Sequence, residues 1–76
     1  MVRYSPGIEQ NMRNYYETLS EKDRRRYAGI EALKLGRGGV TYVAEVLGCR
    51  RKTVRKGRNE VLNLSKAPPS AVDGSG

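Results

Sequence analysis

The chain has 76 residues, the size of one small domain, and it contains no Trp, Phe or His. Its single cysteine excludes an intramolecular disulfide, and the lack of His excludes a zinc finger or a nucleophile activated by His. Fifteen Lys and Arg against eight Asp and Glu give a net charge of +7, which indicates an anionic partner, usually nucleic acid or a membrane surface.

Charged residues recur along the whole chain, so no apolar stretch is long enough for a signal peptide or a membrane-spanning helix. We therefore expect a cytoplasmic protein, associated with the nucleoid, that uses no cofactor, no metal and no membrane. The carboxylates are spread along predicted helices and form no paired acid site, so the chain is expected to bind rather than to catalyse.

Residues 5–36 are predicted to form two supporting helices. Ser5 followed by Pro6 is a helix-start signal, and the first helix is predicted over residues 6–18. Its apolar residues fall at helical spacing and are expected to face inward: Ile8, Met12, Tyr15, Tyr16 and Leu19. Ser20 is expected to cap a second helix that ends at Leu35, before Gly36. The inner face of this helix is predicted to hold Tyr27, Ala28, Ile30, Ala32 and Leu33.

Residues 36–39 read Gly-Arg-Gly-Gly and are predicted to form a flexible connector. The connector lacks the Gly-Lys-Ser/Thr ending and the preceding strand of a nucleotide-binding loop. We therefore do not interpret it as a nucleotide site.

Residues 40–63 have the spacing of a helix-turn-helix, with a short helix over 40–47 and a longer one over 51–63. Gly48 supplies the positive φ that the turn needs, and Cys49 is expected to be a small buried plug rather than a reactive thiol. The side chains or positions expected to face inward are Val43, Ala44, Leu47, Val54, Gly57 and Val61. The predicted fold is therefore all-α, a small domain of about four helices with a homeodomain-like helix-turn-helix.

The opposite face of the longer helix is strongly basic, with six cations within residues 50–58. Arg and Asn can form paired hydrogen bonds with guanine and adenine, and the start of such a helix commonly meets phosphate. The predicted DNA-binding residues are Arg50, Arg51, Lys52, Thr53, Arg55, Lys56, Arg58 and Asn59. Arg37, Thr41 and Tyr42 are expected to add contacts to the DNA backbone.

Local charge pairs distinguish this face from the basic cluster at residues 22–26. Glu21 and Asp23 stand four and three residues before Arg25 and Arg26, so the earlier cluster can be neutralised within its own helix. The longer helix offers only Glu60, four residues after Lys56. Five cations are therefore expected to stay unpaired near a helix N-terminus, where positive charge is disfavoured.

Residues 64–76 contain two prolines and few apolar side chains, and they are predicted to be a disordered tail or a truncated linker. Tyr15, Tyr16 and Tyr27 are expected in the core. No groove of exposed aromatic residues for single-stranded nucleic acid is apparent.

Four runs of residues carry a family resemblance: 16–27 (Tyr-Glu-Thr-Leu-Ser-Glu-Lys-Asp-Arg-Arg-Arg-Tyr), 31–36 (Glu-Ala-Leu-Lys-Leu-Gly), 38–48 (Gly-Gly-Val-Thr-Tyr-Val-Ala-Glu-Val-Leu-Gly) and 51–57 (Arg-Lys-Thr-Val-Arg-Lys-Gly). Over residues 15–62 the chain resembles the N-terminal region of bacterial insertion-sequence transposases, in particular the Rhodopirellula-type DDE transposases. The resemblance implies a bacterial DNA-binding module that recognises the terminal inverted repeats of the element during transposition. It also implies that catalysis belongs to a separate RNase H-like domain, so no activity carries over to these residues.

Two alternatives use the same residues. A free-standing transcriptional regulator would dock on DNA in the same way, and a basic RNA-binding protein would use the cations without reading a groove. The expected partner is double-stranded DNA, with a homodimer or a full-length transposase as the wider context.

Overall fold

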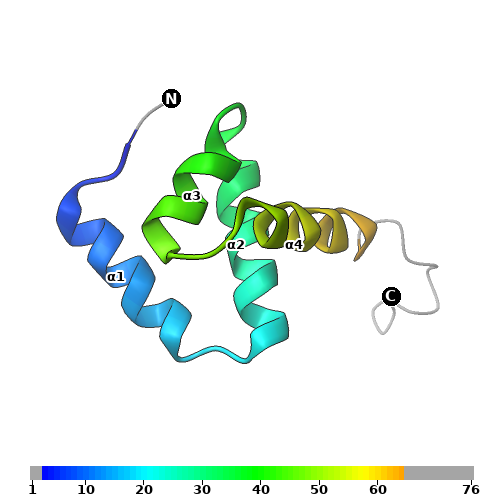
Figure 1. Ribbon diagram of the computed structural model, residues 1–76, viewed down its shortest axis with the longest axis horizontal. Helices are drawn as coiled ribbons and strands as arrows, with labels where there is room; N and C mark the ends of the chain where they lie inside the picture. Colours follow the sequence, from blue (N-terminus) through cyan, green and yellow to red (C-terminus); the bar gives the residue numbers. More distant parts are fainter. Residues whose placement is uncertain (1–2, 65–76) are drawn as a thin grey trace, which may run out of the picture.

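The computed structural model describes residues 3–64, and these form four α-helices and no strand (Figure 1). The helices are α1 (Pro6–Glu17), α2 (Glu21–Leu35), α3 (Gly39–Leu47) and α4 (Arg51–Leu64). The predicted all-α class is thereby confirmed. Helix α4 includes Leu64, which the sequence had placed in the tail, and the rest of the predicted tail lies outside the described residues.

The helix ends follow from the capping residues in the sequence. The hydroxyl of Ser5 accepts a hydrogen bond from the Ile8 N–H, and the hydroxyl of Ser20 accepts one from the Asp23 N–H, both at 3.2 Å. Each bond satisfies a backbone donor that has no partner within its helix. Gly36 closes α2 with a φ of 73°, in the region that favours glycine.

Helix α3 is the centre of the fold and lies between α1 and α2 (Figure 1). It is apolar on nearly all sides, as a helix covered by its neighbours must be. Its buried side chains meet Met12 and Tyr16 of α1, Ala28 and Ala32 of α2, and Val54 of α4. The buried members of α3 are Tyr42, Val43, Ala44, Val46 and Leu47.

Helix α4 crosses the middle of α2, and two glycines meet at the crossing (Figure 1). A Cβ added at Gly57 would overlap the Arg25 carbonyl, and one added at Gly29 would overlap the backbone of Gly57 and Arg58. The two backbones are therefore in direct contact. The sequence had placed Gly57 on the inner face of its helix, and the structure identifies Gly29 as its partner at the crossing.

This close crossing explains where the predicted inner face of α2 is wrong. Ala28, Gly29 and Ala32 are buried, as a face of small residues allows, but Ile30 and Leu33 are exposed. On α1, Met12 and Tyr16 enter the core, whereas Ile8 and Tyr15 remain outside it. The Tyr15 ring instead packs edge-on against half-buried Tyr27, with 5.3 Å between ring centroids.

The glycine crossing predicts a large cost for one methyl group. Gly57→Ala should lower the free energy of unfolding by about 3 kcal/mol or more, because the added carbon meets backbone, which cannot rotate away. Urea denaturation followed by circular dichroism measures this change. Gly7→Ala is the matched control, since only the Ser5 hydroxyl lies near its Cβ, at 4.0 Å. That variant should gain about 0.5–1 kcal/mol from its higher helix propensity. Equal melting of Gly57→Ala and the parent would contradict the crossing.

Candidate nucleic-acid interface

The turn between α3 and α4 has the local geometry that the sequence predicts. Gly48 has a φ of 71°, and the N–H groups of Gly48 and Cys49 both donate to the Ala44 carbonyl, at 2.9 and 3.0 Å. Cys49 is half-buried against the core, and burial raises the pKa of its thiol. Val54 is completely buried, so the first turns of α4 are fixed against α3 and α2.

With Val54 and Gly57 buried, the rest of α4 presents its polar side chains outward. Five of the predicted DNA-binding residues are exposed on the helix: Arg51, Lys52, Arg55, Lys56 and Asn59. Arg50 is exposed directly before the helix, and Thr53 and Arg58 are half-buried at the edges of the same face. The structure therefore brings all eight predicted residues onto one continuous surface, which we call the α4 face.

The cations of the α4 face have no acidic partners. Within residues 3–64, none of the six Lys and Arg side chains from Arg50 to Arg58 makes an ion pair or a side-chain hydrogen bond. The sequence had suggested that Glu60 pairs with Lys56, and this is wrong. The α4 face therefore carries one more unpaired cation than the sequence predicts.

Glu60 instead reaches back to α2. Its carboxylate accepts hydrogen bonds from Arg25 Nε at 3.0 and 3.1 Å and from Arg26 Nε at 3.3 Å, and Arg25 adds a 3.0 Å ion pair. The hydrogen bond from Arg25, followed by the contact with Arg26, lowers the pKa of Glu60. The pairs expected within α2, Glu21 with Arg25 and Asp23 with Arg26, do not form, because the tertiary contact with α4 takes both arginines.

Arg24 also has a structural partner. Its guanidinium donates to the carbonyls of Tyr16 and Glu17, at 3.0 and 3.1 Å, and lies 5.4 Å from the centroid of the Tyr16 ring. It thereby adds side-chain donors to carbonyls in the last turn of α1 and ties that end to α2.

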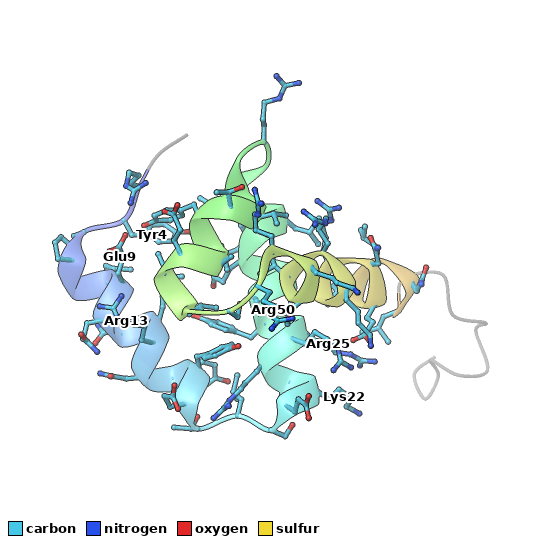
Figure 2. The ribbon with its side chains drawn as sticks, viewed as in Figure 1. Tyr4, Glu9, Arg13, Lys22, Arg25 and Arg50 are labelled. Carbon is cyan, nitrogen blue, oxygen red and sulfur yellow. The ribbon has the colours of Figure 1, made fainter. Side chains whose placement is uncertain are left out.

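Tyr42 corrects the sequence-based interpretation most clearly. Its side chain is only 1% exposed, so it makes no contact with a partner's backbone. Its hydroxyl donates to the Glu9 carboxylate and accepts a 2.9 Å hydrogen bond from the Tyr4 N–H. Figure 2 shows Tyr4 and Glu9 close together beside α3. The spacing within α3 and α4 predicts only how these two helices pack, whereas α1 covers the side of α3 that carries Tyr42.

The other two auxiliary residues, Arg37 and Thr41, are exposed as expected. Arg37 stands in a tight turn rather than in a loose connector, because the Gly39 N–H donates to the Gly36 carbonyl at 2.9 Å. Gly36 and Gly38 both have positive φ, at 73° and 83°, so glycine on either side gives this turn its shape.

Three surface grooves border α4: one lies between α3 and the start of α4, with Glu45 and Arg51 in its lining, and the other two lie along opposite flanks of α4. The α2 groove lies between α4 and the N-terminal half of α2, and its charged lining residues are Glu21, Arg24, Arg25, Arg50, Lys52 and Lys56. Figure 2 shows Arg25, Lys22 and Arg50 on this side of the molecule. The loop groove lies between α4 and the α2–α3 turn, and its polar lining residues are Arg37, Thr41, Arg55 and Arg58. Nothing in the sequence had indicated that Arg24 and Arg25 line a groove with the α4 cations, since this depends on how α2 and α4 cross.

No protein-family model matches the chain, and neither a curated protein nor a solved structure matches it. Within residues 3–64, no helix is long and apolar enough to cross a membrane. The same part of the chain holds no group of three or more His, Cys, Asp or Glu side chains that could bind a metal ion.

The Glu60 contact predicts a stability that depends on pH. Because the pKa of Glu60 is lower in the folded state than its ordinary 4.5, the unfolded state binds the proton first as the pH falls. The contribution is therefore complete above that ordinary value and is lost as the pH falls through the lower folded value. Urea denaturation at a series of pH values should give the parent a higher free energy of unfolding than Glu60→Gln near neutrality. This difference in free energy should shrink in acid. Glu45→Gln, which removes an exposed carboxylate without an ion pair, is the control. A gap that persists unchanged in acid would contradict the assignment.

Tyr42→Phe separates a structural role from a binding role. It removes the bond to Glu9 and leaves the Tyr4 N–H without its acceptor, so the free energy of unfolding should fall by about 1–3 kcal/mol. Affinity for DNA, measured well below the melting temperature, should stay unchanged. A loss of affinity in a fully folded variant would restore Tyr42 to the interface.

Proposed function

We propose that this chain is a sequence-specific module for double-stranded DNA, with α3 and α4 as a homeodomain-like helix-turn-helix and α4 as its recognition helix. One observation carries the proposal: the six cations of the α4 face have no acidic partner in the described part of the chain. Crowded positive charge at a helix N-terminus is unfavourable by itself, and a polyanion relieves it.

The dimensions and side chains of α4 support duplex DNA as that polyanion. Its 14 residues span about 21 Å, and the major groove of B-DNA is wide enough to admit one α-helix. Arg55 and Asn59 stand on the exposed side, where they can form paired hydrogen bonds with guanine and adenine. Arg50 and Thr53 stand at the start of the helix, where phosphates are commonly contacted.

The resemblance of residues 15–62 to insertion-sequence transposases supports terminal inverted repeats as the DNA that is bound. A free-standing regulator would use the same docking, so the choice between these two depends on which sequence the chain selects. We therefore base the test on a duplex selected from a randomised library.

Binding to the selected duplex should depend steeply on salt. Neutralisation of roughly five phosphates predicts a slope near −4 to −5 in the logarithm of affinity against the logarithm of salt concentration. Arg50→Ala should weaken binding equally on the selected and a scrambled duplex, because phosphates carry no sequence information. Arg55→Ala and Asn59→Ala should cost about 1–3 kcal/mol on the selected duplex and relax the choice at one or two base pairs.

Lys34→Ala is the matched control, because Lys34 pairs with Glu31 and lies away from the α4 face. Failure to select any sequence, with equal losses on both duplexes for every α4 variant, would reduce the α4 face to a non-specific electrostatic surface. Stronger competition by RNA than by an equal mass of duplex DNA would replace the proposal with RNA binding.

A further inference from the structure

Because α2 and α4 cross, one half of α2 lies on each side of the proposed recognition helix. Helix α2 has 15 residues, and it meets α4 at Gly29, eight residues after Glu21 and six before Leu35. At 1.5 Å per residue, its ends lie about 12 Å and about 9 Å from the crossing, in opposite directions. The α2 groove is at one end of this helix and the loop groove is at the other.

Two cations of α4, Lys56 and Arg58, lie on opposite flanks of the helix. At 100° per residue, Lys56 falls on the side of α4 toward the α2 groove, and Arg58 falls on the side toward the loop groove. The grooves contain these residues in the same division. Lys52, Arg55 and Asn59 lie between the two flanks, at the centre of the exposed side.

The two grooves differ in whether their cations have partners within the protein. In the α2 groove, Arg24 and Arg25 are engaged with α1 and Glu60, and the carboxylate of Glu21 lies on its rim. Arg50, Lys52 and Lys56 are the unpaired cations of this groove, and Lys56 is the one on the flank of α4 that faces α2. The loop groove has no carboxylate in its lining, and Arg37 is presented there by the turn that the Gly39 N–H closes.

The major groove of B-DNA sets what these flanks would meet. It is about 12 Å wide, and an α-helix with its side chains is about 10–12 Å across, so a helix inside the groove has a phosphate strand against each side. The unpaired flank cations lie on two opposite sides of α4, as such a pair of strands would require.

We propose that the two grooves bind phosphates of opposite DNA strands, the α2 groove through Lys56 and the loop groove through Arg37 and Arg58. This inference rests on the proposed function and specifies how the module is oriented on the duplex. Helix α2 then borders both sites, because its first half lines the α2 groove and its C-terminal end leads into the turn that presents Arg37.

The experiment combines protein variants with duplexes in which the phosphates of one strand are replaced by neutral methylphosphonates around the selected site. On the unmodified duplex, Lys56→Ala and Arg37→Ala should each lower affinity about fivefold at 0.15 M salt, the counterion-release contribution of one phosphate. Neutralising one strand should abolish the loss for Lys56→Ala and leave the loss for Arg37→Ala. Neutralising the other strand should do the reverse. Arg58→Ala should follow Arg37→Ala, and Lys34→Ala should lose affinity on none of the duplexes.

If the losses of affinity for Lys56→Ala and Arg37→Ala both vanish on neutralising the same strand, or on neutralising neither, the two-strand arrangement is wrong. The proposed function would still stand in that case, provided that the selected duplex binds with a steep salt dependence. Failure of the parent to select a duplex would instead contradict the proposed function. Glu21→Gln gives a second measurement at a different residue. Removal of this carboxylate from the rim of the α2 groove should tighten binding, and the gain should vanish when the strand coupled to Lys56 is neutralised. A gain that vanishes with the other strand would also overturn the arrangement.

Discussion

The backbone contact between Gly29 and Gly57 is the constraint on which the rest of the structure depends. Without side chains at these two positions, α2 and α4 approach until backbone meets backbone, and this fixes which side of α4 is buried. The cations of α4 then have only the outward directions available. The same contact explains why α2 packs through small residues, while Ile30 and Leu33 remain exposed beside the crossing. A larger residue at either glycine would move α4 outward and change the rotation of its basic face.

Electrostatic pairing follows the same geometry. The crossing brings Glu60 to Arg25 and Arg26, so the one carboxylate of α4 neutralises α2 rather than its own helix. A pairing of this kind contributes modestly at a partly exposed site. Its larger consequence is the distribution of charge that it leaves, because Arg25 and Arg26 of α2 are paired and the α4 face is not. Within residues 3–64, six unpaired cations are therefore gathered on the α4 face.

Local features of the sequence predicted the helices and most of the buried face of α3 and α4. Ser5, Ser20, Gly36 and Gly48 set helix ends through their own backbone and side-chain chemistry, which sequence spacing reveals directly. Contacts between residues far apart in the chain could not be predicted in this way. The burial of Tyr42 depends on α1 covering α3, and the spacing of apolar residues within α3 does not predict that contact.

The network around Tyr42 has a consequence for α4, although Tyr42 is buried and lies outside the α4 face. Its hydroxyl bonds the Glu9 side chain of α1 and the backbone N–H of Tyr4, just before α1. Both hydrogen bonds hold α1 against α3. Helix α3 in turn holds the start of α4 through the turn at Gly48 and the burial of Val54. A surface of like charges repels itself and favours loosening of the element that carries it. A small domain has only a few kcal/mol of net stability to oppose this repulsion. The contacts behind α3 and across the glycine crossing therefore keep the unpaired cations of α4 on one ordered helix, as the proposed binding to DNA requires.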